Sequence, residues 1–132
     1  MRFLAAPVFV LIAALLAPEA EPGSTGSGLH LRLVRSEPAA DTILATTPAT
    51  LRFIFSEAPD AKGAAVTMAD QAGKAVTLDK PAPDRTDAKL LIVPVPGPLA
   101  AGAYRIAWRV LSRDGHVVRG ELGFTLRPAA QH

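Results

Sequence analysis

The sequence contains no cysteine, and this absence excludes several kinds of chemistry. Without thiols there is no disulfide, no cysteine-ligated zinc or iron–sulfur site, no blue copper centre and no thiol catalysis. Any metal must therefore bind through nitrogen and oxygen ligands. Methionine is also scarce, because only Met1 and Met68 occur, and this excludes a methionine-rich Cu(I) site. We expect Met68 to fill space on the face of a strand.

Long hydrophobic runs are equally limited. The longest is the apolar stretch of 15 residues from Phe3 to Ala17, which is short for a membrane span of ~20 residues. Arg2 precedes it and the small residue Ala20 follows, which predicts a signal peptide over residues 1–20, with an uncleaved membrane anchor as the alternative. We therefore expect the mature protein to lie outside the cytoplasmic membrane.

The positive and negative charges of the chain nearly balance. The chain has 14 Lys and Arg against 12 Asp and Glu, a formal net charge of +2. The arginines alternate along predicted strands and do not form a basic cluster. This pattern argues against a nucleic-acid partner, since such proteins concentrate basic residues on one face.

The remaining chain predicts a single domain. Residues 21–29 form a Gly/Ser-rich spacer, residues 30–127 the folded domain, and residues 128–132 a short tail. The tail ends in His132, which we expect to be solvated.

Apolar and polar residues in this domain alternate with a period of two. Leu51, Phe53 and Phe55 share one face of a predicted strand. Similar segments occur at residues 29–36, 88–95, 104–111 and 117–126, and residues 64–78 predict a hairpin with its turn at 70–73. These segments make about seven short strands. They predict an all-β fold, an immunoglobulin-like antiparallel β-sandwich of Greek-key type without a disulfide, with Trp108 as its core anchor.

The segment "SRDGHVVRG", residues 112–120, allows two interpretations. Asp-Gly is a strong hairpin turn, which would make Asp114 and Gly115 a chain reversal. Alternatively, Asp114 and His116 are two metal ligands that need a third from elsewhere. His30 is the candidate: as a mature N-terminus it would add an amine and an imidazole. The resulting three nitrogens and one oxygen suit Cu(II) in tetragonal geometry.

Two long segments carry a family resemblance. They are "HLRLVRSEPAADTILATTPATLRFIFSEAPD" and "LAAGAYRIAWRVLSRDGHVVRGELGFTL". Over residues 30–126 the chain resembles the CopC family of periplasmic copper-binding proteins. The resemblance implies the same sandwich fold and one Cu(II) per chain, buffered or carried in copper homeostasis or resistance. It also implies an inner-membrane copper-transport protein as a partner.

The resemblance assigns roles to four residues. His30, Asp114 and His116 match the copper ligands of the family, and Glu57 in "FSE" matches a carboxylate that hydrogen-bonds near the copper site. Arg32 stands where many members have a second histidine. Cleavage after Ala20 would leave His30 as the tenth residue, with its nitrogen in a peptide bond.

Two alternatives belong to other functional classes. One is a metal-free immunoglobulin-like module that binds another protein. The other is a copper oxidative enzyme, since an N-terminal histidine resembles the copper brace of polysaccharide-cleaving enzymes. Such enzymes use an aromatic-rich surface, whereas the only Trp and Tyr of this chain, Trp108 and Tyr104, are predicted to point inward. We therefore expect a binding protein and not an enzyme.

Overall fold

The computed structural model describes residues 30–129. Within that range the chain forms nine strands and no helix. The strands are β1 (Leu33–Glu37), β2 (Thr42–Leu44), β3 (Thr50–Phe55), β4 (Asp60–Asp70), β5 (Ala75–Val76), β6 (Ala82–Pro83), β7 (Leu90–Pro94), β8 (Gly102–Leu111) and β9 (Val117–Leu126). No helix in these residues could therefore cross a membrane. The predicted signal peptide, the spacer and His132 lie outside the described residues.

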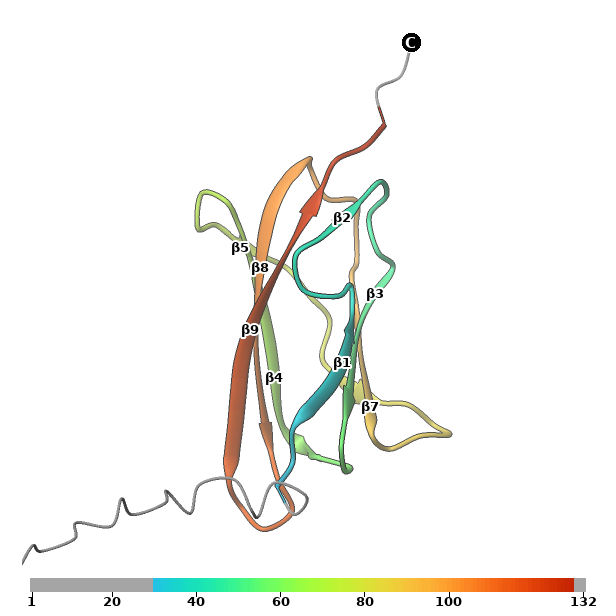
Figure 1. Cartoon of the computed structure of the whole chain (residues 1–132), viewed down its shortest axis with the longest axis vertical. Helices are drawn as coiled ribbons and strands as arrows, with labels where there is room; N and C mark the ends of the chain where they lie inside the picture. Colours follow the sequence, from blue (N-terminus) through green and yellow to red (C-terminus); the bar gives the residue numbers. More distant parts are fainter. Residues whose placement is uncertain (1–29, 130–132) are drawn as a thin grey trace, which may run out of the picture.

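The strands form two sheets that face each other, which confirms the predicted β-sandwich (Figure 1). One sheet has the order β1-β3-β7-β6 and the other has the order β2-β9-β8-β4-β5. Neighbouring strands are antiparallel except β2 and β9, which are parallel. The seven predicted strands are all present: six show alternation, and the two-residue β5 is the second arm of the predicted hairpin. The two additional strands, β2 and β6, have three and two residues, too few to show a period.

The core lies between the sheets and consists of the predicted inward faces. Leu51, Phe53 and Phe55 of β3 are fully buried. Across the sandwich, the edge of the Phe55 ring meets Trp108 of β8, with ring centroids 5.5 Å apart and an interplanar angle of 67°. Such edge-to-face pairs add stability beyond the area that they bury. Met68 is also buried, at 3% exposure, as expected for a residue that fills space.

The register of the strands brings two separate segments to one end of the sandwich. β8 and β9 pair along their whole length until Leu111 meets Val117, so residues 112–116 form a turn at this end. Leu33 of β1 pairs with Phe55 of β3, which places the start of β1 beside the end of β3. In Figure 1 the start of β1 and the β8–β9 turn lie together at the lower end of the molecule.

Candidate metal centre

The β8–β9 connection is a tight turn, as the Asp-Gly pair predicts. The backbone N–H of Ser112 donates to the carbonyl of His116 at 2.8 Å, and the N–H of Gly115 donates to the carbonyl of Ser112 at 3.0 Å. Gly115 has a φ of +90°, in the left-handed region that favours glycine. The turn interpretation of "DGH" is therefore correct for the backbone.

The side chains of the same turn form a carboxylate–imidazole pair. Nδ1 of His116 lies 3.0 Å from Oδ2 of Asp114, and the two side chains are 74% and 61% exposed. This contact leaves Nε2 of His116 facing away from the carboxylate. Metal-binding histidines commonly donate one ring N–H to a carboxylate, which fixes the orientation of the ring. The turn thus already presents an imidazole to solvent in an arrangement that suits a metal.

A buried serine organises this pair. Ser112 is 5% exposed, and its hydroxyl donates a hydrogen bond to Oδ1 of Asp114. Oγ of Ser112 also accepts the backbone N–H of His116 at 3.1 Å. The Ser112 hydroxyl, followed by the His116 side chain, lowers the pKa of Asp114 from 3.8 to about 2. Sequence reasoning assigned no role to Ser112, although serine is among the residue types whose side chains hydrogen-bond within turns.

His30 lies just before β1, outside the strand that the sequence predicted to begin at this point. Its carbonyl is 3.4 Å from the hydroxyl of Ser56, and that hydroxyl oxygen also accepts the backbone N–H of Arg32 at 3.0 Å. Leu31 is buried in the core at 4% exposure, whereas His30 itself is exposed. The residues around His30 are therefore held against the end of β3, and its imidazole stays accessible to solvent.

The end of β3 and the β8–β9 turn line one shallow depression. It contains the candidate carboxylates Glu57 and Asp114, two basic residues and two small ones: Ser56, Glu57, Ala58, Lys89, Arg113 and Asp114. Because Ser56 contacts the backbone of His30, this depression lies beside all the sequence-predicted site residues.

The predicted ligands are assembled only in part. Asp114 and His116 are in contact, but among residues 30–129 no group of three or more His, Asp or Glu side chains is close enough to hold one metal ion. The imidazole of His30 and the carboxylate of Glu57 therefore do not join the Asp114–His116 pair in this conformation.

The donor types nevertheless fit a copper ion. Imidazole nitrogen and carboxylate oxygen are ligands that Cu(II) accepts, and both the His116 and the Asp114 side chains are exposed enough to reach a metal ion. A carboxylate oxygen has two lone pairs, so Asp114 can hold its Ser112 hydrogen bond and still offer a lone pair.

Comparison with known sequences gives a consistent result. Residues 33–127 match the family described as the CopC domain. The chain is 36% identical over 128 residues to copper resistance protein C of Xanthomonas campestris pv. juglandis, covering 92% of this chain and 94% of that protein. It is 34% identical over 105 residues to copper resistance protein C of Escherichia coli, covering 74% of this chain and 82% of that protein.

Solved structures show the same architecture. The crystal structure of CopC from Methylosinus trichosporium OB3b superimposes with a TM-score of 0.71 at 29% identity, covering 78% of this chain and 99% of that one. The structure of PcoC, a methionine-rich copper resistance protein from Escherichia coli, superimposes with a TM-score of 0.67 at 31% identity, covering 74% and 99%.

Proposed function

The chain belongs to the CopC domain family, and we propose that it binds one Cu(II) ion and buffers or carries copper outside the cytoplasmic membrane. The relatives named copper resistance protein C support a role in copper resistance. The observation that carries the proposal is the Asp114–His116 pair, held on a tight turn and exposed to solvent.

The proposed ligands are His30, Asp114 and His116. For Asp114 and His116 to bind the same ion, the imidazole has to turn so that a ring nitrogen faces the metal beside the carboxylate. The rotation breaks the 3.0 Å contact between Nδ1 and Oδ2 of Asp114, and the 74% exposure of the His116 side chain leaves room for it. His30 has to bring its imidazole, and its amine where processing frees it, across the shared depression. The hydrogen bond from Ser56 keeps the His30 backbone within this region.

Glu57 is proposed to support the site without binding copper. It lines the same depression as Asp114, next to Ser56, which contacts the backbone of His30. From this place a carboxylate can accept a hydrogen bond from the imidazole or amine of His30 and fix its orientation.

A binding role is favoured over an oxidative enzyme. The family is one of copper resistance proteins, and the aromatic residues that could stack on a polysaccharide are in the core. Trp108 and Tyr104 are each only 7% exposed. Met68 is likewise buried, so its thioether is not available for Cu(I). We also propose that the predicted signal peptide directs export of the protein. Outside the cytoplasmic membrane the protein then exchanges copper with a membrane copper transporter.

The decisive experiment is a Cu(II) titration of the naturally processed protein, followed by electron paramagnetic resonance. We expect one tetragonal signal that saturates at one equivalent, with three coupled nitrogens if His30 is the free N-terminus. His116→Ala should reduce binding severely. As a matched control, Asp84→Asn removes a carboxylate that caps a different exposed loop through Thr86, and it should leave the signal unchanged.

The contrary results are equally specific. A signal with fewer nitrogens would show that cleavage occurs upstream of His30 and that the site lacks the amine. Unchanged affinity in His116→Ala would overturn the proposed site. If Cu(II) leaves the melting temperature unchanged, the metal-free module is favoured. A specific ligand would stabilise the native state by ~4 kcal/mol at a thousandfold excess over Kd.

A further inference from the structure

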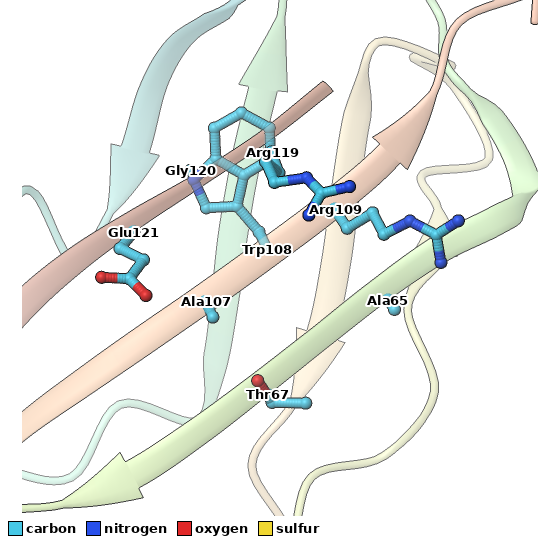
Figure 2. A pocket seen from close by; sticks show the side chains of 8 residues that line it. All are labelled: Ala65, Thr67, Ala107, Trp108, Arg109, Arg119, Gly120 and Glu121. Carbon is cyan, nitrogen blue, oxygen red and sulfur yellow. The ribbon is translucent and has the colours of Figure 1, made fainter. Parts of the chain in front are cut away.

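The outer face of the β2-β9-β8-β4-β5 sheet carries two arginines at directly opposed positions. Arg109 of β8 is in register with Arg119 of β9, and both side chains are exposed (Figure 2). Like charges at opposed positions destabilise an antiparallel pair. Arg105 on the same face is compensated by Glu121 at 3.4 Å. Within residues 30–129, neither the Arg109 nor the Arg119 guanidinium has a hydrogen bond or an ion pair.

The two arginines border a shallow depression with an apolar floor. Small side chains from β4 and β8 form this floor, namely Ala65, Thr67 and Ala107 (Figure 2). The rest of the lining comprises Trp108, Arg109, Arg119, Gly120 and Glu121. Val117, which lies two positions before Arg119 on the same face of β9, is 41% exposed. We call Arg109, Arg119, Val117 and the three small residues the arginine patch.

The arginine patch lies next to the candidate copper turn. Moving along the hairpin from the Arg109–Arg119 pair, only two register positions remain before the turn begins, the last being Leu111 opposite Val117. At ~3.4 Å per residue this is a distance of about 7 Å along the strands. A molecule bound on the patch would therefore touch or nearly touch the turn that carries Asp114 and His116.

From this arrangement we propose that the arginine patch is a docking surface for an acidic, extended segment of the protein that exchanges copper with this chain. Two carboxylates of the segment pair with Arg109 and Arg119, and an apolar side chain on the same face of the segment rests on the floor of small residues. The docking itself follows from the patch, whereas the role in copper exchange rests on the proposed function.

Charge and shape favour a protein segment over other anionic partners. Binding to an anionic membrane surface generally uses clusters of 4–8 basic residues, each worth ~1 kcal/mol, and the patch offers two. A small inorganic anion would use the guanidiniums but not the apolar floor or Val117. Protein interfaces commonly combine arginine with apolar contacts, which matches the composition of the patch.

The first test uses the short acetylated peptide Glu-Ser-Glu-Ser-Val, whose Glu and Val side chains share one face when it is extended, titrated into the full chain. Binding is followed by amide resonances and by the fluorescence of Trp108, the only tryptophan, which lines the depression. We expect saturable shifts centred on Arg109, Arg119 and Val117. The same peptide with Gln in place of Glu should bind much more weakly. Added salt should weaken binding of the Glu peptide, because salt screens exposed charges.

Variants then assign the binding to the patch. The double variant Arg109→Gln/Arg119→Gln should lower the affinity for the Glu peptide about fivefold to tenfold, the effect expected from losing two exposed ion pairs. The matched control Arg35→Gln/Arg85→Gln removes the same net charge from elsewhere on the chain and should leave binding within twofold. Equal binding of the two peptides, or equal loss in both double variants, would refute the docking surface.

Three other outcomes would also overturn it by naming a different occupant. These are patch-dependent binding to phosphatidylcholine–phosphatidylglycerol vesicles without peptide binding, saturation of the patch by inorganic phosphate alone, and patch-dependent dimerisation in analytical ultracentrifugation.

The second test addresses copper exchange and separates its failure from that of the proposed function. The acceptor is the same Glu peptide with a copper-binding Gly-Gly-His at its N-terminus. Transfer of Cu(II) from the wild-type protein should be about fivefold to tenfold faster to this acceptor than to its Gln version, by the same two ion pairs. The advantage should vanish in Arg109→Gln/Arg119→Gln while equilibrium copper affinity is unchanged.

Each failure has its own signature. If the wild-type protein binds no copper but the apo protein binds the peptide, the copper function fails and the docking surface stands. If copper binds but the acidic acceptor has no rate advantage, the copper function stands and the role of the patch in exchange is wrong.

Discussion

The hydroxyl of Ser112 donates a hydrogen bond to the carboxylate of Asp114, and its oxygen accepts the backbone N–H of His116 at 3.1 Å. One buried hydroxyl thus connects the carboxylate and the histidine of the candidate copper turn. The carboxylate in turn contacts the imidazole at 3.0 Å. The geometry of both proposed ligands therefore depends on a residue that is not itself a ligand.

Removing this hydroxyl should change both stability and titration. Ser112→Ala leaves the buried end of the turn without its hydrogen bonds, so we expect a loss of ~1 kcal/mol in the free energy of unfolding. The pKa of Asp114 should rise from about 2 towards 3.8, because the hydroxyl is the largest cause of its depression. Urea unfolding and a pH titration by NMR measure the two effects.

A matched control is available in the same fold. Among residues 30–129, Ser36 is the other buried serine, and its hydroxyl donates to the carbonyl of Pro38 at 3.0 Å, in a different loop. Ser36→Ala should lower stability by a similar amount and leave the Asp114 pKa where it is. Equal Asp114 pKa values in Ser112→Ala and wild type would show that the hydroxyl does not hold the carboxylate.

The acid stability of the protein should reflect Asp114. Its pKa is lower in the folded chain than the ordinary 3.8, so the ionised form favours folding. The resulting stability is fully present above about pH 3.8 and is lost as the pH falls through about 2. Asp114→Asn should flatten the dependence of unfolding free energy on pH in this window. His116→Ala, which removes one of the hydrogen-bond partners, should give an intermediate slope, and identical slopes in all three proteins would contradict this assignment.

Copper affinity should depend on pH in a higher range than the acid stability does. Asp114 remains ionised down to about pH 2, whereas imidazole must be neutral to bind a metal and has a reference pKa of ~6.5. Affinity should therefore fall below about pH 6, measured by competition with a chelator. A loss of copper affinity that begins below about pH 8 would indicate that the α-amine of His30 is also a ligand. Constant affinity down to about pH 4 would exclude histidine as the main ligand.

Gly120 should not tolerate a side chain. A Cβ at this position would lie 2.6 Å from Cζ2 of Trp108, whose ring is packed in the core. We expect Gly120→Ala to destabilise the fold by ~1–3 kcal/mol through overpacking. Gly97→Ala is the control, since a Cβ there has no atom within 4 Å. Thermal unfolding of both variants tests this, and equal melting temperatures would show that the ring moves without cost.

Much of the fold could be predicted because apolar and polar residues alternate along most of its strands. Leu51, Phe53 and Phe55 of β3 point inward with a period of two, and so do the buried residues of β8 and β9. The Asp70–Gly73 and Asp114–Gly115 turns follow from residues that accept positive φ or cap tight loops. β2 and β6 could not be predicted in this way, because two or three residues do not establish a period.

Local patterns in the sequence are therefore enough to predict the strand segments, the turn at "DGH", the available ligand types and the exclusion of thiol chemistry. Packing in three dimensions sets which segments meet: the parallel pairing of β2 with β9, the end of β3 in one depression with the β8–β9 turn, and Arg109 opposite Arg119. The physical reason is that alternation records only which face of a strand is buried. Partner and register depend on packing between residues far apart in the chain, such as Phe55 against Trp108, and no local pattern encodes that contact.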